Sequence, residues 1–591
     1  MFNIRQFLAD YSRDHRTPFN EELFVRDEHD IIEQLKLIIL SITNNEEYDR
    51  IMGDIPINKE ANRFVIKVNY FNVIEDYIKV KEILYDLEKE ENRRNKRIDY
   101  NIHDYINLKD NYIILLEVNY HVEVNGTSAD KSIYIDIPKT VDKYHNILSG
   151  TEYNTSYQMA DASTYNNAQN KKRDPNCAFR QTFQKHNVYK KQVMKINNLL
   201  EFDTTTGQLV PSDITECVNF TIDLFGNNIS INKYFLAAFG LRDAMTYLMI
   251  PEIYVSLDQP KCYDSNIILF NKDNLWITVP KYFFNNSEVV QSFFYTLTQN
   301  APKKTESLEK FFSKFYWLEM LGADYKNKSV QKGVSMLDSV MRNYDFNMRE
   351  ELRLPDEDKR NLLDIMRWQM YEFDALYAKD NYDMSYKKLR LASYIAGLYA
   401  RQLSYNLISI SKSISTLTAE KLIKNLAIPH NWVINKMTDS DQSAVIAYNN
   451  NVNDDDTYST LKGTIKGVSG IGENKASAVP LDCKLCNASH IGKVDCDTSP
   501  AGDPGMTCMI CPDFRTFGKG QYMSNFKEPC SWREIQQGMM DDYRRIMSVK
   551  SVFATREELM GTTEGSQILS QLDSISKRIT NLLPYTVGTN L

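Results

Sequence analysis

The spacing of hydrophobic and polar residues predicts a mixed α/β region over the first 150 residues. "DIIEQLKLIILSI" (30–42) repeats apolar residues at intervals of three or four, which is the period of a helix that buries one face. "NRFVIKVNYFNVI" (62–74), "NYIILLEVNYHVEV" (111–124) and "KSIYIDIP" (131–138) alternate apolar and polar residues, as strands do. The stretch 78–96 predicts a second helix that runs into a charged loop.

The middle of the chain changes from polar to helical. Residues 151–210 are polar and broken, and 166–176 predicts an exposed loop. From 303 to about 380 the pattern is helical. One apolar stripe in this region is expected to lie in the core, and its members are Leu362, Ile365, Met366, Met370, Phe373 and Tyr377.

A stronger helix is predicted over 386–414. No acidic residue occurs from Lys387 to Thr418, whereas a solvated helix face usually carries both signs of charge. One face is therefore expected in the core and the other is a candidate for lying near phosphates. The predicted core positions are Leu389, Ala392, Ala396, Tyr399, Leu403, Leu407, Ile410 and Ile414.

The chain after Pro429 is loop-rich until about residue 515 and then becomes helical again. Near the end, apolar residues step by four and three along a short heptad seam. So short a seam is a poor isolated coiled coil, so we expect it to dock on the core or on a partner. The seam comprises Ile568, Leu572, Ile575, Ile579 and Leu582.

Composition narrows the class of protein. With 591 residues, 42% hydrophobic and 25% charged, the chain is expected to form three or four globular domains. The net charge of -8 argues against a stand-alone nucleic-acid binder, but a local basic patch remains compatible with it. The first residues, "MFNIRQFLADYSRD", do not predict a signal peptide, and no apolar run predicts a membrane span. Nine cysteines in such a chain are expected to be thiols or metal ligands inside the cell.

Two polar stretches could carry chemistry. "NNNVNDDDTYSTLKG" (449–463) contains three consecutive aspartates, of which Asp454 and Asp456 could share one ion in extended chain. A polar turn is the favoured interpretation. The following stretch, 461–477, carries four glycines together with Lys462, Lys466 and Lys475, and resembles a flexible basic loop that could approach a nucleic-acid backbone.

Two Cys-x-x-Cys pairs flank the next loop. Cys483 with Cys486 and Cys508 with Cys511 are separated by 21 residues, which fits a structural four-cysteine zinc ribbon. His490 and Cys496 lie between the pairs and could replace a ligand. The sequence leaves open whether this is a zinc site or a functional loop that happens to be flanked by cysteines.

In their order along the chain, these pieces resemble the N-terminal half of the beta subunit of multisubunit DNA-dependent RNA polymerase. "GVSGIGENK" (467–475) stands where that family has I-S-x-L-G-P-G-G. "NASHIGKVDCDTSPAGDPG" (487–505) stands where the family has H-P-x-H-x-G-R-x-C-P-x-E-T-P-E-G. The positions that match in kind are His490, Gly492, Lys493, Pro500 and Gly502.

Three further stretches match the same family in the same order. "KYHNILSGTEYNTSYQ" (143–158) is similar to a family strand pair and keeps Gly150, Glu152 and Gln158. "EFD" (201–203) followed by "INKYFLAAFGL" (231–241) is similar to a family strand and helix. The stretch 387–414 resembles a family basic helix, with Lys387, Lys388, Arg390 and Arg401 aligned.

The resemblance implies an α+β multidomain fold with protrusion, lobe and fork domains. Residues 1–158 would form the first, α/β part of the protrusion, and 383–445 its second, helical part. The lobe (159–382) would be inserted between them, followed by the fork region (446–530) and a helical docking segment (531–591). The residues expected to face nucleic acid are Lys387, Lys388, Arg390, Arg401, Asn451, Asp454, Lys462, Lys466, Ser469, Lys475, His490, Lys493, Pro500 and Gly502.

The resemblance also implies partners. The family's second half, with its metal-proximal acids, has no room in this chain, so a split beta subunit of the giant-bacteriophage kind is expected. A C-terminal beta-like chain, two beta-prime-like chains and a promoter-specificity subunit would complete the enzyme on DNA template and RNA transcript. Mg2+ would be held by a beta-prime-like partner. The family normally keeps no metal at the fork, so Zn2+ at the four cysteines is an expectation that rests on their spacing alone. The assembly would act in the cytoplasm of the infected bacterium or be packaged in the virion.

The chain also departs from the family. Thr498, Ser499 and Ala501 replace most of the family's acid-rich E-T-P-E. Gly467 and Thr464 stand where the rifamycin pocket has an arginine and a histidine, so resistance to rifampicin is expected. The alternative hypothesis is a zinc-ribbon protein that binds nucleic acid or another protein without catalysis.

Overall fold

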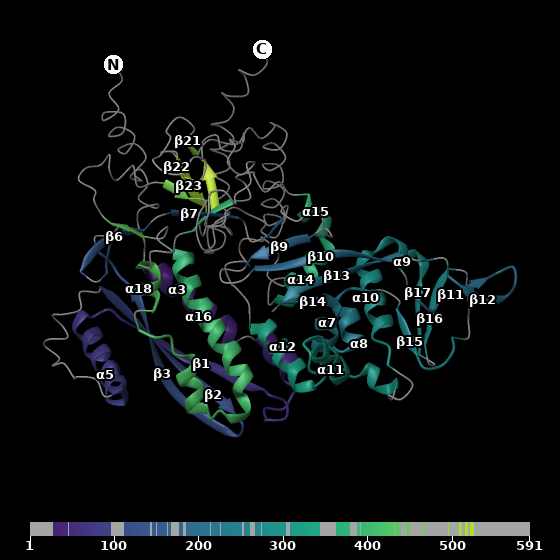
Figure 1. Cartoon of the computed structure of the whole chain (residues 1–591), viewed down its shortest axis with the longest axis horizontal. Helices are drawn as coiled ribbons and strands as arrows, with labels where there is room; N and C mark the ends of the chain where they lie inside the picture. Colours follow the sequence, from purple (N-terminus) through teal and green to yellow (C-terminus); the bar gives the residue numbers. More distant parts are fainter. Residues whose placement is uncertain are drawn as a thin grey trace, which may run out of the picture. The chain divides into compact units, whose positions relative to one another are not determined.

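In the computed structural model (Figure 1), residues 1–523 form one compact unit, which contains two modules. The described residues are 28–44, 46–95, 112–141, 145–148, 150–155, 157–161, 164–166, 176–180, 185–194, 196–212, 214, 216–224, 226–250, 253–260, 266–272, 275–302, 308–342, 362–378, 387–390, 392–430, 432–438, 446–448, 462–464, 494–495, 507–510, 514–517 and 521–524.

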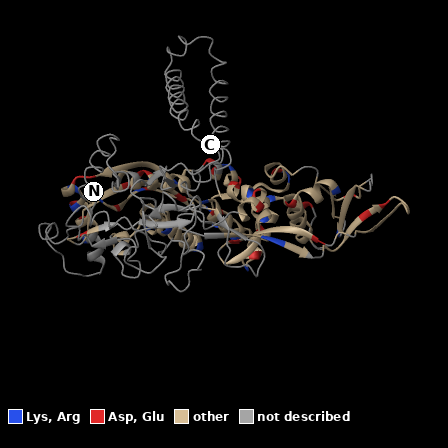
Figure 2. Cartoon of the chain, turned by 90° about the horizontal axis from the view of Figure 1, so that it is seen from above, with Lys and Arg blue, Asp and Glu red and all other residues tan. Residues whose placement is uncertain are grey.

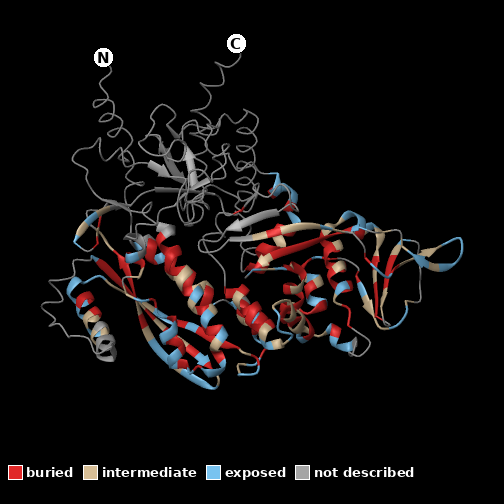
Figure 3. Cartoon of the chain, in the orientation of Figure 1, coloured by how far each residue is buried: buried red, intermediate tan, exposed pale blue. Residues whose placement is uncertain are grey.

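The first module joins two parts of the chain that are far apart in sequence. Its antiparallel sheet has the order β1-β2-β3 and is formed by Phe64–Ile74, Ile113–Val124 and Thr127–Pro138. Its helices are α3 (Glu28–Thr43), α5 (Tyr77–Asn95), α16 (Ala392–Ser413), α17 (Ala419–Leu426) and α18 (Trp432–Thr438), with the 3-10 turn η5 (Ile414–Thr416). One hydrophobic core, drawn from 31–148 and 395–434, lies between this sheet and α3, α16 and α17 (Figure 3).

A two-residue turn fastens the β2–β3 hairpin to the helical layer. Asn125 and Gly126 both have positive φ, 50° and 77°, which a tight hairpin turn requires. The Asn125 side chain donates hydrogen bonds to the carbonyls of Ile414 (2.6 Å) and Leu417 (3.2 Å). The turn therefore binds the backbone at both ends of the segment that starts with η5, where the Ile414 carbonyl also accepts from the Leu417 amide.

The second module contains two antiparallel five-stranded sheets and most of the remaining helices. One sheet has the order β14-β13-β10-β9-β8, formed by Asn227–Ser230, Glu216–Leu224, Lys185–Met194, Asn176–Arg180 and Thr164–Asn166. The other has the order β12-β11-β16-β17-β15, formed by Gln208–Pro211, Leu199–Asp203, Ile267–Lys272, Leu275–Pro280 and Tyr254–Ser256.

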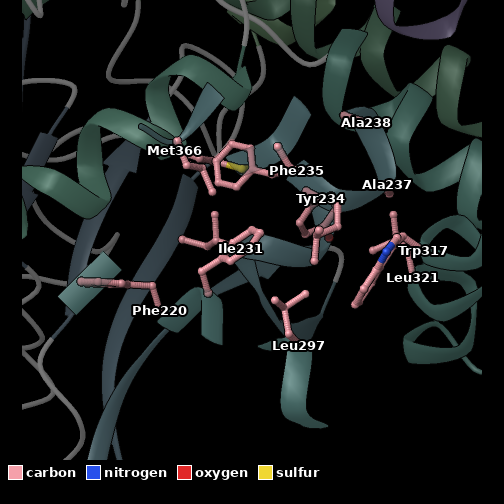
Figure 4. Packing of buried hydrophobic residues seen from close by; sticks show 14 of the residues in the cluster. Phe220, Ile231, Tyr234, Phe235, Ala237, Ala238, Leu297, Trp317, Leu321 and Met366 are labelled. Carbon is pink, nitrogen blue, oxygen red and sulfur yellow. The ribbon is translucent and has the colours of Figure 1, made fainter. Parts of the chain in front are cut away.

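Helices of the second module surround one large core. Figure 4 shows Tyr234, Phe235 and Trp317 packed with aliphatic side chains from several elements, and all three are fully buried. The core also takes in residues of α4 (Glu46–Met52) and of the loop after it. The other helices are α7 (Ile231–Phe239), α8 (Leu241–Tyr247), α9 (Lys281–Asn286), α10 (Glu288–Gln299), η2 (Leu308–Phe312), α11 (Lys314–Asp324), α12 (Val330–Arg342), α14 (Leu362–Tyr371) and α15 (Phe373–Tyr377).

Most predicted elements are confirmed, and the errors have identifiable causes. The predicted helices 30–42 and 78–96 correspond to α3 and α5, and the three predicted strands to β1, β2 and β3. The stripe from Leu362 to Phe373 is buried as predicted, whereas Tyr377 is exposed. Residues 151–210 contain the strands β6 to β12. The sequence did not predict them, because polar residues within them, such as Lys190 and Lys191 in β10, interrupt the apolar alternation. Leu389 does not belong to the helix predicted over 386–414, since 387–390 form a strand and α16 begins at Ala392.

The described part of the chain contains no helix long and apolar enough to cross a membrane. The fold is mixed α and β with several sheets, in agreement with the predicted α+β class.

Candidate nucleic-acid interface

A seven-stranded sheet gathers short strands from distant parts of the chain. Its order is β21-β22-β20-β7-β18-β24-β23, and Figure 1 labels β7, β21, β22 and β23. The strands are Val494–Asp495, Thr507–Ile510, Lys462–Thr464, Tyr157–Asp161, Lys387–Arg390, Gln521–Ser524 and Phe514–Phe517. The sheet therefore brings together segments that the sequence analysis considered separately.

Gln158 lies at the centre of this sheet. On one side β7 pairs in parallel with β20, where Gln158 is the Cα partner of Thr464. On the other side β7 pairs antiparallel with β18, where Gln158 is the partner of Arg390. Thr464, Gln158 and Arg390 thus occupy one row across three neighbouring strands, which we call the central row.

A second row lies beside the central row. Lys388 is the partner of Ala160 on β7 and of Gln521 on β24, so its backbone is paired on both sides. Lys387 is aligned with Asp161, which places an acidic residue opposite one of the predicted cations. Three predicted phosphate-contacting residues are therefore fixed in one strand, at the middle of the sheet.

The other half of the sheet contains the segments around the cysteine pairs. Strand β22 pairs antiparallel with β20, with Lys462 opposite Met509 and Gly463 opposite Cys508. Glycine at 463 also pairs with Tyr157 on the other side. Cys508 therefore lies on β22, which is separated from β7 by the single strand β20.

Helix α16 connects β18 to the core of the first module. Directly after β18, α16 buries Tyr399, whose hydroxyl donates a hydrogen bond to the carbonyl of Asp136 on β3. Arg401 is half-buried on the same helix, apart from the sheet strands that hold the other predicted cations. Three strands that precede β7 join the later strand β19 in a four-stranded sheet. Its order is β19-β6-β5-β4, from Ile446–Tyr448, Thr151–Thr155, His145–Leu148 and Thr140–Val141.

The strands on either side of the aspartate run in sequence pair with two consecutive strands. Tyr448 at the end of β19 pairs with Tyr153 on β6, and β20 pairs in parallel with β7. A strand pair is present in the stretch 143–158, as β5 and β6, which pair antiparallel with Gly150 at a positive φ of 75° between them.

The arrangement concentrates cationic residue types on two strands that flank β7. β18 supplies Lys387, Lys388 and Arg390, and β20 supplies Lys462. Elsewhere on the described elements, acidic and basic residues are interspersed (Figure 2). Arginine and lysine held at fixed strand positions are suited to contacting phosphate oxygens.

Much of the predicted site lies outside the described residues. This applies to Asn451, Asp454, Lys466, Ser469, Lys475, His490, Lys493, Pro500 and Gly502, to Cys483, Cys486 and Cys511, and to the seam from Ile568 to Leu582. Within the described ranges, no group of three or more His, Cys, Asp or Glu side chains could hold a metal ion. The zinc site remains a prediction.

One part of the site was missed by sequence reasoning. Strands β23 and β24 complete the sheet beyond β18, and Gln521 is the direct partner of Lys388. Four-residue strands such as "QYMS" are too short to show a period, so the sequence carried no usable signal for them.

Comparison with known proteins agrees with this arrangement at the level of the family. A search of curated proteins finds no significant match. A family model described as non-virion RNA polymerase subunit matches residues 15–530, which include both modules and every strand of the seven-stranded sheet. Neither the fold nor this match supports the alternative of a zinc-ribbon protein without catalysis. The chain belongs to the family of non-virion RNA polymerase subunits.

Proposed function

We propose that this chain is the N-terminal beta-type fragment of a phage multisubunit DNA-directed RNA polymerase, and that its seven-stranded sheet forms part of the wall of the DNA/RNA-hybrid channel. The observation that carries the proposal is the central row. Gln158 and Arg390 come from two separate stretches that resemble the beta subunit, Thr464 lies three residues before a third, and backbone pairing aligns them. An accidental likeness of three stretches would not require them to meet.

The order of the two modules supports a beta-type chain. The first module is built from 28–148 and 392–438, and the second module occupies most of the interval between them. A protrusion made of two segments with a lobe inserted between them would have this connectivity. The lobe and protrusion assignments belong to the proposal.

Each element of the sheet has a defined task in this proposal. Arg390 offers a planar guanidinium that can hold a phosphate with two hydrogen bonds, whereas Lys388 and Lys462 act as point charges. The paired backbone fixes the spacing of these residues along the nucleic acid. Such contacts position the duplex and carry no sequence information of their own.

The chemistry of nucleotide addition would reside on a partner. Mg2+ bound by a beta-prime-like chain would neutralise charge that develops on the transferred phosphoryl group. This chain would supply positioning and no catalytic residue. A C-terminal beta-like chain, a second beta-prime-like chain and a promoter-specificity subunit would complete the assembly, which we place in the cytoplasm of the infected bacterium.

Reconstitution tests this function. The chain is co-expressed with one beta-like and two beta-prime-like partners, purified through a tag on this chain, and assayed for RNA synthesis on phage DNA. We expect RNA only from the complete assembly and none from the 591-residue chain alone. An assembly that synthesises RNA at full rate without this chain, or RNA synthesis by the chain by itself, would show the proposal to be wrong.

A further inference from the structure

The chain crosses between the two modules twice within a short stretch. Helix α3 belongs to the first module and ends at Thr43, and β1 returns to that module at Phe64. The residues between them contribute Tyr48, Ile51, Met52, Ile55 and Ala61 to the core of the second module. We call residues 44–63 the excursion, and its two crossing points, near Ile42 and Phe64, the neck.

One buried side chain of the second module holds both sides of the neck. Arg342 is the last residue of α12, and its side chain is 3% exposed. Its terminal nitrogens donate hydrogen bonds to the carbonyl of Ile42 (3.1 Å) and to the carbonyl of Phe64 (3.1 Å). A single guanidinium therefore binds the backbone where the chain leaves the first module and where it returns.

The remaining surfaces of Arg342 are also occupied. Its Nε donates to Oδ1 of Asp338 (2.9 Å), and a terminal nitrogen donates to the hydroxyl of Tyr48 (2.7 Å). The Tyr48 hydroxyl in turn donates to Asp338. The guanidinium carbon lies 4.3 Å from the centre of the Tyr48 ring and 4.7 Å from that of Phe64, within the range of cation–π contact.

Two further contacts fasten the excursion on either side. The Lys314 ammonium of α11 donates to the carbonyl of Ile51, which ties the excursion to the second module. The Asn62 side chain donates to the carbonyl of Ser411 on α16 (3.1 Å), which ties it to the first module. The excursion is thus held from both modules, and Arg342 is the contact that reaches both crossings of the neck.

We infer that Arg342 couples the first and second modules into one rigid body within the polymerase, by locking the neck of the excursion. Lysine cannot replace it, because an ammonium has no planar fork with which to bind two carbonyls, a carboxylate and a hydroxyl at once. Without Arg342, the carbonyls of Ile42 and Phe64 lose their charged donor in a buried place, and the neck opens while each module keeps its own core. This inference does not depend on which polymerase subunit the chain represents.

Hydrogen–deuterium exchange on the purified assembly tests the coupling, with the parent chain compared with Arg342→Lys. We expect exchange at the end of α3, the start of α4 and the start of β1 to accelerate by at least about tenfold, as the loss of charged hydrogen bonds predicts. Exchange in β2 and β13, which lie inside the two modules, should stay unchanged. Arg367→Lys is the matched control, because this arginine of α14 binds the carbonyl of Tyr247 (3.1 Å) within the second module and lies 4.7 Å from the centre of the Tyr247 ring.

A second variant keeps the test decisive if Arg342→Lys does not assemble. Tyr48→Phe retains the ring beside the guanidinium but removes the hydroxyl that links it to Asp338, and should produce the same pattern with a smaller acceleration. Unchanged exchange at the neck in an assembled variant would overturn the inference. So would an equal acceleration in β2 and β13, which would make Arg342 a general stabiliser of the cores.

Discussion

Gly333 on α12 and Leu318 on α11 lie where the backbones of two helices touch. A Cβ atom added to Gly333 would lie 1.9 Å from the carbonyl oxygen of Leu318. At the same junction, a Cβ on Gly322 would lie 2.4 Å from the carbonyl oxygen of Ser329. Both obstacles are backbone atoms, so no side-chain rotation relieves them.

Replacing Gly333 by alanine should force α11 and α12 apart. Because overpacking of a filled core costs about 1–3 kcal/mol, we expect the free energy of unfolding to fall by at least that amount. Chemical denaturation followed by circular dichroism measures the change. Gln331→Ala, at an exposed position of the same helix, should change stability little or raise it slightly. Equal stability of Gly333→Ala and the parent would contradict the close helix contact.

The cations of β18 should determine how DNA binding by the assembled polymerase depends on salt. If Lys388 and Arg390 each contact one phosphate, Lys388→Gln with Arg390→Gln should reduce the slope of log K against log salt by about 1.4–1.8. Fluorescence anisotropy at several salt concentrations gives this slope. Lys131→Gln, on the exposed part of β3, serves as the control and should leave the slope unchanged. An unaltered slope in the double variant would exclude phosphate contacts by β18.

Zinc bound by the two cysteine pairs would be detected by metal analysis. We expect one zinc ion per chain after subtraction of the zinc held by partner chains, and loss of that ion in Cys508→Ser. Structural zinc contributes on the order of 10 kcal/mol to folding, so the variant should also lose protection of the fork region against proteases. Cys217→Ala, which changes a buried free cysteine in β13, should retain the metal. The same zinc content in parent and Cys508→Ser would show that the pairs hold no metal.

Rifampicin should inhibit this polymerase poorly. Thr464 and Gly467 replace the histidine and arginine expected in the inhibitor pocket, and each lost hydrogen bond to a charged group costs about 1.5–3 kcal/mol. We expect the inhibitory concentration to exceed that for a bacterial polymerase by at least about a hundredfold. Transcription assays run side by side, with the same template and nucleotides, decide the matter. Equal inhibition of the two enzymes would contradict the alignment at these positions.

His121 should make the stability of the first module depend on pH. Hydrogen bonds to Glu123 and Asp130 raise its pKa above the ordinary value of 6.5. Since the folded-state pKa is the higher one, the stabilisation is fully present below 6.5 and is lost as pH rises through the raised value. His121→Gln should therefore destabilise the chain more at about pH 5.5 than at about pH 8. Thermal unfolding at both values measures the difference, and an equal effect at both would contradict the prediction.

The sequence was sufficient to predict the helices and strands that bury one face. In α3, β1 and β2 the apolar period survives intact, because each packs one side against a core. It was insufficient for β10, whose Lys190 and Lys191 interrupt the apolar alternation. Lys190 is placed there because its ammonium bridges Glu288 and Asp374, which are close only in the folded chain.

The residues of the candidate site could be predicted from the sequence, but their arrangement in one sheet could not. Sequence reasoning identified Arg390, Lys462 and Gln158 from local patterns and resemblance. It could not predict that β20 runs parallel to β7 while β18 runs antiparallel to it, since the register of a strand is set by its distant neighbours. Arg342 gave no signal for the same reason, because both carbonyls that it binds lie about 280 residues or more earlier in the chain.

The topology of the seven-stranded sheet also delays the pairing of β7 during synthesis of the protein. About 300 residues separate Gln158 from its neighbour Thr464, and a ribosome adding roughly 5–20 residues per second needs about 15–60 s to cover that distance. Strand β7 lacks both flanking strands until β18 is made, about 230 residues later, and it lacks β20 until the end of this interval. Its unpaired edges are open to other chains, which favours aggregation. Slow translation therefore lengthens the time for which the edges of β7 are unpaired, and rapid completion of the chain as far as residue 464 shortens it.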